Sequence, residues 1–174
     1  MTESEVFELV TGSGSSDFAI LIGILSRHGS WCLIGGLAVN CYVEPVFTLD
    51  ADIVVVSSAL PAIESDLIRV GFAVEEFEHS VNAKMTGSDL RIQFSKDPRY
   101  QSFLANAKRL AVLGHDVPVA SLEDVIKGTI WAWSDARRRA TKRKKDELDL
   151  MRILEGYPHT RKLMPEQIKS QVLE

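Results

Sequence analysis

The chain has 174 residues, of which 45% are hydrophobic and 25% are charged, values that are typical of one soluble globular domain. The net charge of -4 excludes a general affinity for nucleic acid, and two cysteines are too few for a disulfide framework. No apolar run approaches the ~20 residues that a membrane span needs, and the acidic start MTESEVFELV does not resemble a signal peptide. We therefore expect a cytoplasmic protein without a membrane partner.

The pattern of apolar and turn residues predicts helices and strands in alternation, then a β meander, then helices. In chain order, we expect a helix at 16–28, a strand at 31–34, a short helix at 37–43, a buried strand at 51–57 and a helix at 58–70. Three alternating segments follow at 72–78, 80–86 and 89–95, and the last two are expected to form a hairpin. Further on, 98–114 is predicted to be mostly helical, 115–120 to be a strand, 121–158 to be two helices, and the region from 165 onward to be a last helix.

This order of elements predicts an α/β (α+β) fold, with a mixed sheet flanked by helices and a helical C-terminal part. We expect a core at 1–120 and a C-terminal helical extension at 121–174 that together form one compact unit.

Two aspartates stand at the start of the predicted buried strand, where an unpaired carboxylate is costly. Residues i and i+2 of a strand share a face, so Asp50 and Asp52 project together and repel each other unless a cation lies between them. Mg²⁺ accepts one or two carboxylates together with phosphate oxygens, and two metal ions can share such a pair. The pair therefore indicates a Mg²⁺ (or Mn²⁺) site; the alternative is an Asp-x-Asp that faces solvent at a strand end.

Two glycines lie upstream of this pair, between a predicted strand and a predicted short helix. Gly35 and Gly36 allow backbone N–H groups to approach a phosphate. Thr48 lies two residues before Asp50, on the acidic face, where it can hydrogen-bond a ligand or an aspartate. The segment thus combines elements of a phosphate site with elements of a metal site.

Gly35-Gly36 followed by TLDAD at 48–52 resembles the signature of the nucleotidyltransferase fold of the DNA polymerase β superfamily. With SLEDVIKGTIWAW and KRKKDELDLMRIL, the chain is most similar to small bacterial nucleotidyltransferases related to the AbiEii toxins of toxin–antitoxin and phage-defence systems. The resemblance implies transfer of a nucleoside monophosphate from an NTP to a protein or RNA hydroxyl, with pyrophosphate released. It implies that Asp50 and Asp52 hold magnesium and that Gly35 and Gly36 line the triphosphate, and it implies RNA or a cognate toxin or antitoxin protein as partner.

The sequence departs from this family at the third carboxylate, which lies on a later strand. Gln93 occupies that position and cannot act as a base. Asp89 has the same strand parity but lies about 13 Å away along an extended strand. Loss of a general base slows chemistry by roughly 10²–10⁴-fold without abolishing nucleotide binding. The alternative hypothesis is therefore a degenerate module that binds nucleotide or a partner protein without transfer.

The C-terminal part contributes cations. Lys127 either reaches the triphosphate as a point charge or pairs with Glu123 one helical turn away. Seven basic residues lie within 137–145 of an otherwise acidic chain, which favours contact with RNA or an NTP, or a solvated helix junction in which Lys145 pairs with Asp149. A third hypothesis is therefore an RNA-binding protein that acts through 137–145.

Overall fold

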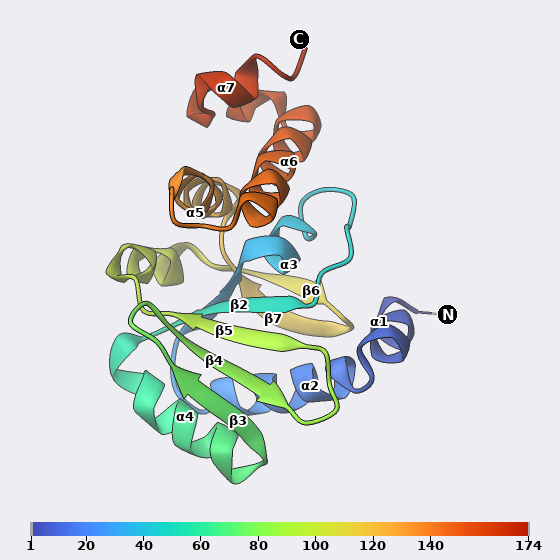
Figure 1. The fold of residues 1–174 in the computed structure, drawn as a ribbon, viewed down its shortest axis with the longest axis vertical. Coiled ribbons are helices and arrows are strands. Elements are labelled where there is room, and N and C mark those ends of the chain that lie inside the picture. The colour runs from blue at the N-terminus through green and yellow to red at the C-terminus, as the bar shows by residue number, and fades with distance from the viewer. Residues whose placement is uncertain (1, 174) are drawn as a thin grey trace.

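The computed structural model describes residues 2–173, and these form a seven-stranded mixed sheet covered by helices on both faces (Figure 1). The strand order is β3-β4-β5-β2-β1-β7-β6. The strands are β1 (Trp31–Ile34), β2 (Asp50–Val55), β3 (Phe72–Glu76), β4 (Ser80–Met85), β5 (Arg91–Ser95), β6 (Lys108–Val112) and β7 (His115–Val119). The predicted fold class is confirmed.

The helices fall on two sides of this sheet. In Figure 1, α2 and α4 cover one face, while α3, α5 and α6 stack over the other, with α7 at the far end. The α-helices are α1 (Glu3–Thr11), α2 (Gly14–Leu25), α3 (Gly35–Val39), α4 (Leu60–Arg69), α5 (Leu122–Ser134), α6 (Ala140–Gly156) and α7 (Glu166–Lys169). The 3₁₀ segments are η1 (Ser57–Ala59), η2 (Pro98–Asn106) and η3 (Pro158–Leu163).

Strand β2 lies at the centre of the sheet, antiparallel to β1 and parallel to β5. Its alternation places Ala51 and Ile53 in the core, each fully buried, while the two aspartates turn to the opposite face. The register sets Asp52 beside Ile34 of β1 and Gln93 of β5. The predicted central strand and the predicted β4–β5 hairpin are both confirmed.

One hydrophobic cluster joins the sheet to the C-terminal helices. Ile126 of α5 and Leu150 of α6 are fully buried in the same cluster as Leu33 of β1. Two tyrosines add hydrogen bonds between distant segments. The Tyr42 hydroxyl donates to the Ala120 carbonyl, and the Tyr157 hydroxyl donates to the Tyr42 carbonyl. Residues from both sides of the predicted boundary at 120 thus share one core, and the division itself stays a prediction.

Predicted and observed elements differ at several places, most clearly at β6 and α1. The helix predicted for 98–114 ends at η2, and 108–112 is strand β6, so the helical prediction is wrong there. Leu113 and Gly114 both have positive φ, at 49° and 81°, the geometry of a tight hairpin turn between β6 and β7. Helix α1 was not predicted, although Thr2 and Glu5 form a capping box at its start.

Within 2–173, no single helix is long and apolar enough to cross a membrane. The pair Ser4–Thr11 and Gly14–Leu25, bent by 109°, meets that criterion jointly, by length and composition alone.

Candidate active site

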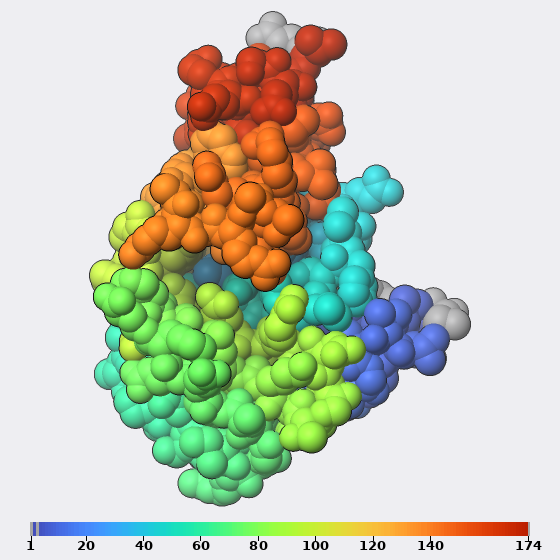
Figure 2. All heavy atoms as spheres, viewed as in Figure 1, coloured from blue at the N-terminus to red at the C-terminus, as the bar shows by residue number. Residues whose placement is uncertain are grey.

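A cavity of about 200 Å³ opens between the acidic face of β2 and the first turns of α6. Figure 2 shows the hollow between the orange C-terminal helices and the cyan and green sheet segments. The cavity brings acids and cations together: its charged lining is Asp50, Asp52, Asp124, Arg138, Lys142, Lys145, Asp146 and Asp149. It is therefore a polar site, which is suited to a charged ligand.

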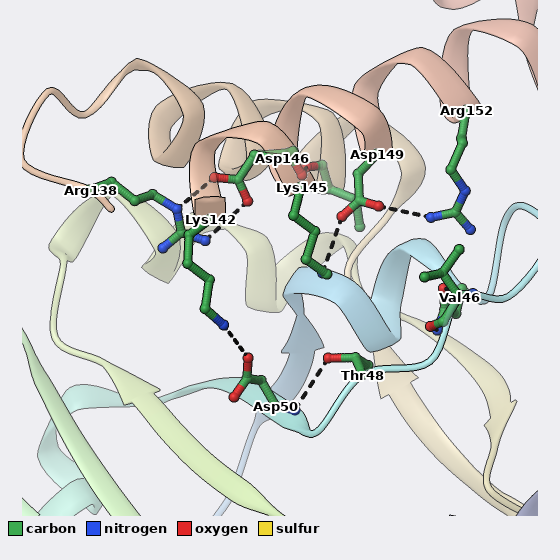
Figure 3. Close-up of polar contacts among 12 residues, drawn as sticks. Val46, Thr48, Asp50, Arg138, Lys142, Lys145, Asp146, Asp149 and Arg152 are labelled. Carbon is green, nitrogen blue, oxygen red and sulfur yellow. Dashed lines mark hydrogen bonds and ion pairs between the residues drawn. The ribbon is translucent and has the colours of Figure 1, made fainter. Parts of the chain in front are cut away.

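Asp50 is held by two cations from opposite sides. Its Oδ1 accepts from Nε of Arg91 on β5 at 2.6 Å. Its Oδ2 accepts from Nζ of Lys142 on α6, also at 2.6 Å (Figure 3). Burial by itself would raise the pKa of Asp50, but the hydrogen bonds from Lys142 and Arg91 bring that pKa below its ordinary value. Asp50 is therefore ionised, and both of its oxygens are engaged.

Asp52 is the less compensated member of the acidic pair. Its carboxylate forms no hydrogen bond or ion pair with any other residue in 2–173. Burial and the neighbouring charge of Asp50 raise the pKa of Asp52 to about 6, although Lys145, Arg138 and Lys142 act in the opposite direction. A cation placed between the two carboxylates would relieve this repulsion.

The two glycines make close approaches from α3. Gly35 has a φ of 67°, and a Cβ there would stand only 3.0 Å from Cβ and Cγ of Asp52. A Cβ on Gly36 would stand 2.7 Å from Nζ of Lys145. The bare backbone of α3 is thus inserted between an acid of β2 and a cation of α6.

Thr48 completes this side of the cavity. It is buried, with 7% of its surface exposed, and its Oγ1 accepts from the backbone N–H of Asp50 at 3.2 Å. The hydroxyl therefore orients the start of β2.

Acids on α6 orient the cations of the opposite wall. Arg138 donates through Nε and Nη2 to Asp146, at 2.6 and 3.0 Å. Asp149 accepts from Lys145 at 3.4 Å, the pair expected under one of the two interpretations of 137–145, and from Arg152 at 2.8 Å (Figure 3). The carboxylates hold these side chains in place beside the cavity.

Of the basic residues in 137–145, Arg138, Lys142 and Lys145 line the cavity, and only Lys145 was named individually from the sequence, as a partner of Asp149. Arg138 lies before α6, in the α5–α6 connection, and Lys142 and Lys145 of α6 are spaced by three residues. Positions with that spacing share one face of a helix, so this signal was present in the sequence.

The structure brings together most of the predicted site residues. Those that line the cavity are Gly35, Gly36, Thr48, Asp50, Asp52 and Gln93. Asp89 lies outside the cavity lining, at the turn before β5, where its backbone N–H donates to the Thr11 carbonyl. The expected position of Lys127 needs correction: its Nζ pairs with Asp124 at 3.3 Å, neither with Glu123 nor in the cavity lining.

Neither a protein-family model nor the sequence of a curated protein matches the chain. Solved structures do resemble it. The solution structure of the antibiotic-resistance factor ANT(2'')-Ia has a TM-score of 0.58 at 14% identity, covering 89% of this chain and 89% of that one. The lincomycin-bound lincosamide antibiotic adenylyltransferase LnuA has a TM-score of 0.55 at 13% identity, covering 78% of this chain and 94% of LnuA.

A third structure, an antigenic nucleotidyltransferase-like protein from Paracoccidioides brasiliensis, has a TM-score of 0.54 at 15% identity. The match covers 87% of this chain and 81% of that protein. The chain has the nucleotidyltransferase fold. The resemblance inferred from the glycine pair and the TLDAD segment is thus confirmed for the fold.

The cavity of this nucleotidyltransferase fold meets part of what a divalent metal requires. Among the described residues, no group of three or more His, Cys, Asp or Glu side chains is placed to hold a metal ion. The donor set is the Asp50–Asp52 pair alone. Two carboxylates suit Mg²⁺ when phosphate oxygens supply further ligands. The residues thus fit a metal that is shared with a triphosphate better than a metal bound by protein alone.

Proposed function

We propose that this protein is a nucleotidyltransferase that uses Mg²⁺ or Mn²⁺ to transfer a nucleoside monophosphate from an NTP to a hydroxyl group. One observation carries the proposal: a pair of carboxylates on β2 faces three cations from 138–145 across one cavity. Two proteins with this fold support it, since LnuA is an adenylyltransferase and ANT(2'')-Ia is found in complex with adenylyl-2''-tobramycin.

Each wall of the cavity has a role in this reaction. Arg138, Lys142 and Lys145 neutralise the triphosphate, and Asp50 and Asp52 are the metal ligands. The acceptor hydroxyl oxygen bonds to the α-phosphorus and loses its proton to water, the bond from this phosphorus to the bridging oxygen breaks, and pyrophosphate leaves. The metal, when bound, supplies charge neutralisation at the reacting phosphate. Gly35 and Gly36 allow α3 to pack closely between Asp52 and Lys145, and Thr48 orients the start of β2.

The proton of the acceptor hydroxyl lacks an obvious recipient on β5. Gln93 lies beside Asp52 in the sheet register, where the family resemblance implies a third carboxylate. Because the Gln93 amide cannot accept this proton, we expect slow transfer. The amide at this position is also the observation that favours the second candidate, a degenerate module that binds nucleotide or a partner protein without transfer.

The acceptor is proposed to be an RNA or a protein hydroxyl. The outward face of the α5–α6 connection favours an anionic acceptor, because Arg137 and Arg139 are exposed next to the cavity-lining cations. An RNA would add phosphate contacts there, and its binding would weaken steeply with salt. A place in a toxin–antitoxin or phage-defence system, with a cognate partner protein in the cytoplasm, is proposed on the resemblance alone.

The test is label transfer. The protein is incubated with each α-labelled NTP and Mg²⁺, together with total RNA or candidate partner proteins, and macromolecular label is measured. We expect transfer that falls at least about 100-fold in Asp50→Ala and Asp52→Ala, since metal ligation supplies several kcal/mol to the transition state. Asp116→Ala is the matched control, because Asp116 is an exposed acid of β7 that pairs with Arg109 outside the cavity.

Other outcomes discriminate between the hypotheses. Nucleotide binding without pyrophosphate release would support the degenerate module. RNA binding that depends steeply on salt, requires 137–145 and is indifferent to Asp50→Ala would support the RNA-binding protein.

A further inference from the structure

Lys142 differs from the other cavity-lining cations in where it finds its partner. Arg138 pairs with Asp146, and Lys145 pairs with Asp149, so both are held by acids of α6. Lys142 instead reaches from α6 across the cavity to Asp50, a residue 92 positions away in the chain (Figure 3). The Lys142–Asp50 ion pair therefore links the C-terminal helices to the acidic strand.

The Lys142–Asp50 ion pair occupies Oδ2 of Asp50, an oxygen that the proposed metal site needs. Lys142 holds Oδ2 of Asp50 and Arg91 holds Oδ1, each at 2.6 Å. The engaged carboxylate cannot serve a cation until at least one of these bonds opens. Asp52 is open but offers one carboxylate, which is a weak ligand set for a divalent ion without further oxygens.

The two partners of Asp50 differ in their access to a triphosphate. Lys142 lines the cavity, whereas Arg91 does not. A lysine is a point charge on a flexible four-carbon stem, so it can exchange one anionic partner for another by rotation of its own side chain. Phosphate oxygens in the cavity would compete with Asp50 for this ammonium.

We propose that Lys142 holds the Asp50 carboxylate before nucleotide binds and transfers to phosphate oxygens when a triphosphate enters, so that Asp50 becomes available to a cation only then. This inference rests on the proposed function, because it assumes that the cavity receives a triphosphate. It assigns to Lys142 a positioning role that makes the binding of metal depend on the binding of nucleotide.

Two measurements on the full chain test the exchange. The first is binding of Mn²⁺ alone, which is monitored by the decrease in the electron paramagnetic resonance signal of free Mn²⁺. The second is binding of a non-hydrolysable ATP analogue in EDTA. Lys142→Met is expected to bind Mn²⁺ about tenfold more tightly than wild type, since a charge-assisted bond no longer competes for Asp50. The same variant is expected to bind the analogue about tenfold more weakly, since a phosphate partner is lost.

Two further variants separate exchange from simpler effects. Lys144→Met removes the same charge from α6, but Lys144 pairs with Glu147 and lies outside the cavity lining, so we expect both affinities to stay at the wild-type level. Arg91→Met removes the other partner of Asp50, so we expect tighter Mn²⁺ binding with unchanged analogue binding. A thermal melt of each variant checks that the fold persists, and Lys142→Gln replaces Lys142→Met if the latter unfolds.

The proposal fails if both Lys142 variants leave the Mn²⁺ affinity at the wild-type value, or if Lys144→Met raises it equally. It also fails if loss of Lys142 tightens Mn²⁺ binding and leaves the analogue affinity unchanged, because Lys142 would then be a fixed partner of Asp50. In each of these cases the wild type still binds the analogue, and the proposed function stands. A wild type that binds no analogue at all overturns both proposals together.

Discussion

Gly35 and Asp52 approach so closely that no side chain fits between them. A Cβ on Gly35 would lie 3.0 Å from Cβ and Cγ of Asp52, and closer still to Oδ2. The φ of Gly35, 67°, is in the left-handed region, so both the backbone and the contact require glycine. The position of the Asp52 carboxylate is thus coupled to the first residue of α3.

Gly35→Ala is therefore expected to lower stability and to displace Asp52. Strain at positive φ costs about 1–2 kcal/mol, and the contact adds to it. Gly29→Ala is the matched control, because Gly29 has a φ of 88° and open space around its Cα. Urea unfolding should show a larger loss for Gly35→Ala, and Mn²⁺ binding with nucleotide should weaken only in that variant. Equal losses of stability with intact Mn²⁺ binding would contradict this coupling.

Asp52 is expected to make stability depend on pH. Its pKa is raised to about 6 from an ordinary value of 3.8, so between about pH 4 and 6 the folded state binds more protons than the unfolded state. The free energy of unfolding contributed by Asp52 therefore falls as pH rises through this window. Asp52→Asn removes that loss, and in EDTA the variant should exceed wild type at pH 7 by about 3 kcal/mol at most.

Urea unfolding of both proteins from pH 4 to pH 7 measures this difference, which should be smallest at the acidic end. Asp50 supplies an internal contrast, because its pKa is lowered. Its contribution is present above its ordinary pKa and is lost as the pH falls, so Asp50→Asn should destabilise the protein at pH 7. Parallel stability curves for wild type and Asp52→Asn would refute the assignment.

Gln93→Asp is expected to increase transfer. Gln93 lies beside Asp52 in the parallel β2–β5 register and lines the cavity, so an acid there would stand next to the proposed metal ligands. A positioned general base contributes roughly 10²–10⁴-fold, and we expect a gain at the lower end of this range. Initial rates of label transfer check the gain, with Gln93→Asn as the isosteric control. A rate that stays at the wild-type level would mean that the missing acid is not what limits the reaction.

Lys145 and Lys127 are expected to differ in their effect on nucleotide binding. Lys145 lines the cavity above Gly36, whereas Lys127 is an exposed side chain that pairs with Asp124. Lys145→Met should weaken binding of the ATP analogue about tenfold, since one charge-assisted phosphate contact is lost. Lys127→Met should leave the affinity unchanged. The reverse order in a calorimetric titration would support the triphosphate contact that the sequence left open for Lys127.

Local patterns predicted a large part of the fold. The apolar run of β2 and the alternation in β4 and β5 lie where expected. These signals depend on neighbours within a few residues of each other. Strand β6 was missed because its pairing with β7 outweighs the helical propensity of its own residues.

The sequence by itself determined that Asp50 and Asp52 share a face next to a glycine pair, because strand alternation is a property of the local backbone. Only the tertiary structure decided which cations meet them. Helix periodicity groups Lys142 and Lys145, but the packing of α6 over the sheet turns this pair toward β2, and the α5–α6 connection brings Arg138 to the same cavity. The same packing joins Lys142 to Asp50 across 92 residues, a distance over which no local pattern carries information.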